Sequence, residues 1–216
     1  MFWSRSSISD DMRYWKLDCF EWFDEMFEPP KLPILPTKSF FSAPGGRDLA
    51  TAKLVLEEIK GHMNLEEEVD MYPIKNVPPE HRHEYQALSS IAGTYEKIDG
   101  SSVIRYDPEL MQNPIIFINM LAHELMHARL NGLEDEIPGG EEAHELATDL
   151  GCVIAGFGAF QLQAADDAGW FGYLSQPSRA FALAVFLDRR GLGIEAVEKY
   201  LSSRCKKYMR RAFKDL

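Results

Sequence analysis

The sequence predicts an α+β fold, because two short strand-like segments come before a longer series of helical segments. The strand-like segments are residues 68–74 and 101–108, and helical periodicity dominates the rest of the chain. A chain of 216 residues fits one ordinary domain that buries a sizeable core without disulfides. We therefore expect a mainly helical α+β domain with a small sheet.

The composition and charge of the chain narrow the classes of function. Three cysteines without close spacing argue against a disulfide framework and favour a cytoplasmic protein. The sequence shows no secretory signal and no apolar run of about 18 residues, so we expect no membrane partner. The net charge of −11 disfavours nucleic acid as a partner, and the basic C-terminal stretch complements the dipole of a helix end.

Residues 1–45 are predicted to form an arm that precedes the main domain, residues 46–216. Within the arm, residues 9–28 are expected to be helical after a serine or aspartate cap. The prolines of residues 29–36 fix φ and remove donors, which predicts an extended strap between the arm and the domain.

One face of the predicted arm helix is aromatic. It carries Trp15, Cys19, Trp22 and Met26, with Phe23 and Phe27 beside them. Such a face needs cover, so it either packs against the body of the chain or docks a protein partner or a second copy through Trp15, Trp22 and Phe27.

The first half of the main domain is expected to start with a helix over residues 47–63, where apolar residues recur at helical spacing. Alternation predicts a strand over 68–74, and a second strand over 101–108 ends at Asp107–Pro108. An apolar helix follows over 114–131.

That apolar helix is expected to stop at Asn131–Gly132, since both residue types end helices. A long helix is predicted over about 142–163, and another over 175–190 begins with a serine cap and a proline. A final helix is expected over about 194–213.

The stretch HELMH within the apolar helix carries the main chemical signal. His123 and His127 are four residues apart, so both imidazoles lie on one helix face and can hold a single zinc ion. Glu124 is placed to accept a proton from water and to pass it to a leaving amine. Because the flanking residues are apolar, polar side chains here must be paired or ligated.

A catalytic zinc ion needs a third protein ligand. A metzincin would carry glycine and histidine where this chain has Leu130 and Leu133, so that arrangement fails. The next helix offers Glu145 as the ligand and Asp149, four residues later, to orient a ligand imidazole through its second nitrogen. Glu142 or His144 remains an alternative ligand.

The combination of HELMH with Glu145-Leu-Ala-Thr-Asp149 resembles the gluzincin arrangement of thermolysin-like zinc peptidases. The wider pattern is similar to small bacterial minimal gluzincin-like proteins of uncertain substrate, and the resemblance is specific over roughly residues 102–160. It implies a zincin-like fold and an edge strand that pairs with extended substrate, for which residues 103–108 are the candidate. It also implies the same ligands, His123, His127 and Glu145, with Glu124 as general base.

The resemblance implies a downstream histidine and tyrosine that stabilise an oxyanion, but no histidine follows His144 here. Tyr173 or Arg179 is the candidate donor, and the alternative is that the tyrosine packs between helices while the arginine lies on the surface. Residues 81–83, HRH, either bind a second metal or form a solvated loop, and Cys152 is expected in the core.

The sequence thus predicts a zinc-dependent peptidase that hydrolyses peptide bonds in a peptide or protein substrate. The alternatives are a zinc-stabilised binding module, whose site would be closed by a fourth ligand such as His144, and a zinc hydrolase acting on another substrate.

Overall fold

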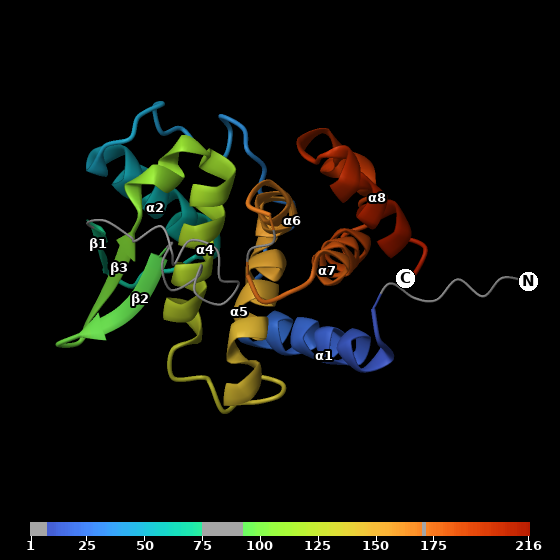
Figure 1. Cartoon of the computed structure of the whole chain (residues 1–216). Coiled ribbons are helices and arrows are strands. Elements are labelled where there is room, and N and C mark those ends of the chain that lie inside the picture. Colours follow the sequence, from blue (N-terminus) through green and yellow to red (C-terminus); the bar gives the residue numbers. More distant parts are fainter. Residues whose placement is uncertain (1–7, 75–92, 170–171) are drawn as a thin grey trace, which may run out of the picture.

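The computed structural model describes residues 8–74, 93–169 and 172–216 and has a mixed α+β architecture (Figure 1). Helices pack beside a three-stranded sheet, as the sequence predicts. The helices are α1 (Asp10–Met26), α2 (Leu49–Met63), α4 (Pro114–Leu130), α5 (His144–Cys152), α6 (Gly158–Asp167), α7 (Gln176–Asp188) and α8 (Ser203–Ala212). The strands are β1 (Val69–Pro73), β2 (Gly93–Ile98) and β3 (Ser101–Tyr106).

The order of the strands corrects one expectation. The sheet runs β1-β3-β2, with β1 parallel and β2 antiparallel to β3. Residues 103–108 were expected to form an edge strand, but β3 is the central strand of the sheet. The burial of Val103, Ile104 and Tyr106 agrees with this central position. Strand β2, which the sequence analysis missed, is one edge; its residues are mostly polar and exposed, so they carry no apolar alternation.

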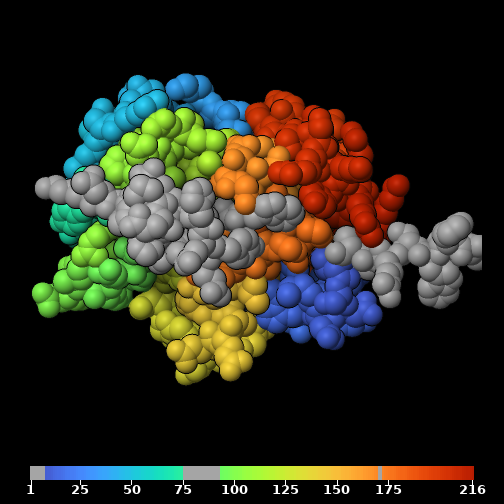
Figure 2. Space-filling model, viewed as in Figure 1, coloured from blue at the N-terminus to red at the C-terminus, as the bar shows by residue number. Residues whose placement is uncertain are grey.

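Helix α4 occupies the middle of the molecule. It contacts α2 and β2 on one side and α5 and α6 on the other, so it separates the sheet from the C-terminal helices (Figure 1). The sheet side and helix α8 accordingly lie at opposite ends of the face shown in Figure 2. Asn113 caps α4, Pro114 occupies its first turn, and the chain leaves it at Asn131 and Gly132, as predicted.

Helix α1 packs against the body of the chain, which was one of the two alternatives for its aromatic face. Its apolar side chains that are buried in the core are Cys19, which lies on the predicted face, Phe23, which was predicted beside it, and Phe20, which was not predicted. Met26 is 40% exposed, while Trp15, Trp22 and Phe27 are partly buried against the core. The difference arises because most positions on this helix are apolar or aromatic, so periodicity alone does not select the face.

The predicted strap continues from α1 without regular structure, and it explains a break in the next long helix. The N–H of Ile34 donates to the carbonyl of Gly156 at 2.9 Å. Gly156 has φ +95°, and a Cβ there would approach Pro30 and Ile34 to 2.9 Å. Residues 142–163 are therefore not one helix, but α5, a π-helical turn and α6.

Helices α7 and α8 in the C-terminal part correspond to the two helices predicted there. Helix α7 begins at the predicted serine cap, Ser175. The final helix is shorter than expected, because two 3₁₀ turns occupy residues 194–200 and Ser202 caps α8. Among the helices that the structure describes, none combines the length and the apolar character needed to cross a bilayer.

Candidate metal centre

The C-terminal half of α4 presents two histidines and a glutamate. His123 and His127 lie one helical turn apart, and their rings meet edge to face with centroids 4.8 Å apart. The apolar neighbours Leu121 and Leu125 are buried and anchor this part of the helix in the core. Rotation of α4 is thereby restricted, and the two imidazoles keep a common direction.

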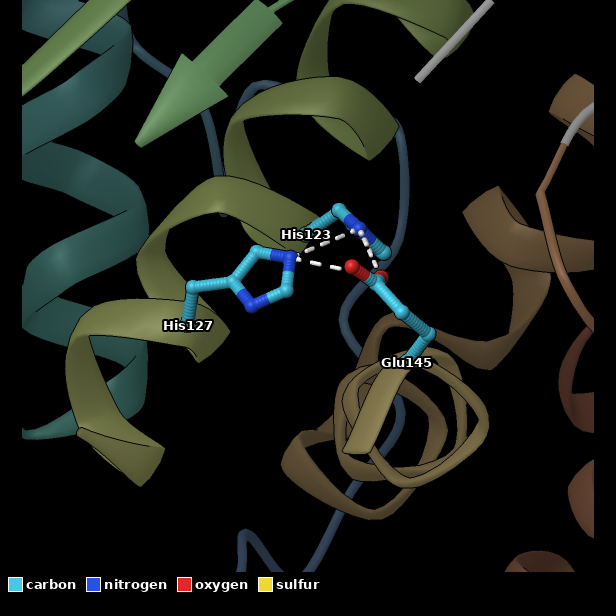
Figure 3. A group of neighbouring side chains, drawn as sticks. All are labelled: His123, His127 and Glu145. Carbon is cyan, nitrogen blue, oxygen red and sulfur yellow. Dashed lines mark hydrogen bonds and ion pairs between the residues drawn. The ribbon is translucent and has the colours of Figure 1, made fainter. Parts of the chain in front are cut away.

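Helix α5 brings the third side chain to the same point (Figure 3). One ligand atom from each of His123, His127 and Glu145 lies within 4.8 Å of the other two. The Nε2 atoms of the two histidines are 3.1 Å apart, and each is 3.5 Å from Oε2 of Glu145. These are the three residues that the sequence analysis named as ligands.

The three separations fit a tetrahedral zinc ion. Ligand atoms about 2.05 Å from such an ion are about 3.3 Å from one another, and the observed values lie on either side of that figure. Oε2 of Glu145 is also buried and has no hydrogen-bond partner among the described residues. A buried acceptor of this kind calls for a cation, so the donor set and its spacing suit Zn²⁺.

Asp149 lies behind His123, where the sequence analysis expected it. Its Oδ1 is 3.1 Å from Nδ1 of His123, so the imidazole donates to the carboxylate and keeps Nε2 free to bind a metal. Its Oδ2 accepts hydrogen bonds from the backbone N–H groups of Tyr173 and Leu174 and from Nη2 of Arg179. These hydrogen bonds to both oxygens fix the orientation of the Asp149 carboxylate.

Arg179 is buried and pairs with Asp149, which corrects the expectation that it lies on the surface. Its side chain is 1% exposed, with Nη2 3.0 Å from Asp149 and Nε 3.2 Å from Oε1 of Gln161. Helix α7 is largely buried, so an arginine one turn from its start points inward and pairs with a buried acid. Its proximity to Asp149 carries no signal in the sequence.

His144 stands behind His127 and does not join the three converging side chains. Its Nε2 is 3.0 Å from Nδ1 of His127, and the two rings are nearly parallel. His144 therefore orients a ligand through its second nitrogen, as Asp149 does for His123. Glu142, the other alternative ligand, is exposed and outside the group that the described residues form.

The electrostatics of the group favour a bound positive charge. Burial alone would lower the pKa of His123, but its contacts with Asp149 and Glu145 raise that pKa to about 10. Burial alone would raise the pKa of Glu145 and of Asp149. Hydrogen bonds with His123 and His127 nevertheless lower the pKa of Glu145, and Arg179 and His123 lower that of Asp149 to about 2. Two ionised carboxylates thus face the imidazoles, and burial lowers the pKa of His127 so that it stays neutral.

Glu124 lies next to the group and beside edge strand β2. Its carboxylate is buried, and burial raises its pKa to about 7, while the backbone N–H of Tyr95 in β2 stabilises the ionised form. A Cβ on Gly93 would come within 3.3 Å of Cγ of Glu124, so β2 runs close to α4 here. A carboxyl group with this pKa exchanges a proton readily near neutral pH.

Tyr173 borders the candidate metal centre, and Cys152 lies in the core. The ring of Tyr173 stacks on His123 with centroids 6.0 Å apart and 11° between the planes, so it borders the site. Cys152 is buried in the core, as predicted, and burial raises the pKa of its thiol. Residues 81–83, named as a possible second metal site, lie outside the described residues.

Comparison with known proteins provides no relative. No protein-family model matches the chain, and neither a curated protein nor a solved structure is significantly similar to it. The chemistry of the described residues therefore carries the functional interpretation.

Proposed function

We propose that this protein is a zinc-dependent peptidase with a zincin-like fold and a gluzincin-type site. The observation that carries the proposal is the convergence of His123, His127 and Glu145 at the mutual distances of zinc ligands, with a buried glutamate beside them. Among the described residues the group has three members. Three ligands are the number that a catalytic zinc site uses, since it leaves one position for water or substrate.

The residues of the site are proposed to bind the metal, to transfer a proton or to orient the metal ligands. His123, His127 and Glu145 would hold the ion, which when bound supplies Lewis-acid activation of a carbonyl and of water. Glu124 takes a proton from the attacking water and delivers it to the leaving amine, a role that suits its pKa of about 7. Asp149 and His144 keep the two imidazoles in the tautomers that bind a metal.

The position of strand β2 supports the proposal that the substrate is a peptide. Within the described part of the chain, β2 pairs only with β3, and we propose that a substrate strand adds to its other edge. Because β2 passes beside Glu124, an extended peptide added to this edge would bring its backbone to the site. The edge strand that the gluzincin resemblance implies is thus proposed to be β2 and not β3.

Tyr173 is the proposed oxyanion donor. Its ring stacks on His123, and its backbone is tied to Asp149 at 2.7 Å, so the phenol is carried on a segment anchored to the site. A phenol O–H is a suitable donor to a developing oxyanion. We expect Tyr173→Phe to lower kcat about 10- to 100-fold while zinc content is unchanged.

The deciding experiment combines metal analysis with a cleavage screen. We expect the purified protein to hold one zinc ion per chain and to cleave members of a fluorogenic peptide library. Glu124→Gln should keep the zinc and lose activity by at least about 100-fold, whereas Glu142→Gln, at an exposed acid, should change neither property.

The possible outcomes separate the alternatives. A Glu124→Gln variant as active as the parent would disprove the mechanism. A protein that holds zinc with no exchangeable ligand and cleaves nothing would instead be the zinc-stabilised binding module. Cleavage of esters or other amides in place of peptides would retain the metal site and reject the substrate class.

A further inference from the structure

A cavity of about 610 Å³ lies at the other end of α4, away from the metal ligands. It is open to solvent on one side and lies between the segment 36–47, the start of α2 and the first turns of α4. In Figure 1 this segment crosses the top of the molecule beside the first turns of α4. The volume is within the range of about 300–1,000 Å³ that is usual for sites of small ligands.

The floor of the cavity is apolar. Val55 of α2, Met111, and Phe117 and Ile118 of α4 line it, and all four side chains are buried by the surrounding protein. Phe41 and two prolines of the segment 36–47 add apolar walls. Water in such a space finds few partners, so an apolar group that displaced it would be stabilised by about 0.8 kcal/mol for each CH₂ buried.

The rim of the cavity is cationic. Lys38 and Arg47 are exposed and line it, and no acidic residue does, in a protein whose net charge is −11. Nζ of Lys38 donates to the carbonyl of Ala43 at 3.3 Å, which holds the ammonium group at the rim. Arg47 makes no hydrogen bond or ion pair with the other described residues.

The acid that follows Arg47 in the sequence, Asp48, caps helix α2. Oδ1 of Asp48 accepts a hydrogen bond from the backbone N–H of Thr51 at 2.8 Å, as the cap of α2. Its carboxylate is thus directed to the helix end. Lys38 and Arg47 form no ion pair with any described residue, and two cations at the mouth of an apolar pocket match a ligand that has an anionic head and an apolar tail.

We propose that this cavity is a binding site for an amphiphilic monocarboxylate, such as a medium-chain fatty acid. The alkyl tail occupies the floor formed by Val55, Met111, Phe117 and Ile118, and the carboxylate lies between Lys38 and Arg47. None of these residues belongs to the candidate metal centre, so the site is independent of the proposed peptidase function.

The test is calorimetric titration of the full chain with octanoate, decanoate and dodecanoate below their micelle concentrations. We expect saturable binding of one molecule per chain, tightening about fourfold for each added CH₂ until the cavity is full. Decyltrimethylammonium, with the same tail and the opposite charge, should bind at least tenfold more weakly than decanoate. The same result is expected for Glu124→Gln, which separates this site from the metal centre.

Variants at the rim provide the matched comparison. Arg47→Gln and Lys38→Gln should each weaken decanoate binding about two- to fivefold, the range of an exposed ion pair. Lys53→Gln removes the charge of an exposed lysine on α2 that does not line the cavity, and it should leave binding unchanged. Equal losses for all three variants would overturn the proposal.

A variant in the floor tests the place of the tail. Val55→Phe should abolish decanoate binding while the thermal transition of the protein is retained. Undiminished binding by a folded Val55→Phe variant, equal binding of the cationic amphiphile, or the absence of saturable binding would each reject the site. If Val55→Phe does not fold, the rim variants and the two amphiphiles decide the question.

Discussion

Helix α4 borders an apolar cavity with its first turns and carries the candidate metal ligands in its last turns. The two ends differ in how their side chains are held. At the cavity, Phe117 and Ile118 face a space of about 610 Å³. At the metal centre, the histidines are backed by His144 and Asp149, and Asp149 by Arg179.

The two ends of the helix differ in the kind of contact that fixes their side chains. A buried polar network tolerates little movement, because any unpaired member has a high desolvation cost. An apolar hollow loses only dispersion contacts, and a ligand can restore them. The same helix therefore combines an anchored group of ligands with a space that can accept an apolar ligand.

Removal of the cation behind Asp149 should produce the largest effect. Arg179→Met leaves a carboxylate with an exposed fraction of 2% next to His123 without its ion pair. We expect a loss of about 3–5 kcal/mol in the free energy of unfolding, measured by urea denaturation. The control variant Arg105→Met, which breaks an exposed ion pair with Glu96, should lose about 1 kcal/mol or less. Similar losses for the two variants would show that the buried ion pair does not stabilise the fold more than an exposed one.

Truncation along α4 sharpens the comparison of its two ends. Leu121 is fully buried within the core, so Leu121→Ala should cost about 3–5 kcal/mol. Ile118 already lacks neighbours on its cavity side, so Ile118→Ala should cost less, about 2–3 kcal/mol. Denaturant unfolding of both variants measures the difference, and a greater loss at Ile118 would contradict the presence of open space there.

Loss of the imidazole behind His127 should weaken metal binding without removing it. His144→Ala is expected to reduce zinc affinity about 10- to 100-fold, since a ligand histidine depends on the group that orients it. His144→Gln, which retains a polar side chain at that position, should restore part of the affinity. Competition with a zinc-binding dye measures both, and an unchanged affinity in His144→Ala would remove His144 from the site.

Lys16 is buried and, unlike Arg179, forms no ion pair with a carboxylate of the described residues. Its Nζ is 3.2 Å from Oγ of Ser178, and burial lowers its pKa from 10.5 to about 7. Above pH 7 the unfolded chain therefore binds more protons at this lysine than the folded chain does, so its cost to stability falls as pH rises. This cost is fully present below pH 7.

The variant Lys16→Met should consequently gain stability over the parent, and the gain should shrink by about 1–2 kcal/mol between pH 7 and about pH 8.5. The comparison uses the difference between the two proteins, so that contributions of His123 and other groups cancel. Urea denaturation at the two pH values measures it. Lys53→Met, at an exposed position, should show no such dependence, and a constant gain for Lys16→Met would exclude the titration.

Much of the local structure was predictable because it depends on short-range patterns. The α+β class, the cap Ser175 and the stop at Asn131–Gly132 are confirmed, and Ser9 is the cap of α1, one of the two alternatives for it. Strand β2 and the break at Gly156 were not predicted. The first has a polar sequence, and the second depends on contact with a strap more than 100 positions away in the chain.

The sequence by itself determined which residues could act as metal ligands, because a spacing of four residues brings side chains together on any helix. The close approach of Glu145 and Asp149 to the histidines required the packing of α5 on α4. Tertiary structure alone decided that Arg179 supports Asp149, that His144 supports His127, that β2 is the edge strand beside Glu124, and that an apolar cavity opens beside α2. These features join segments that are distant along the chain, and their proximity depends on how the whole core packs.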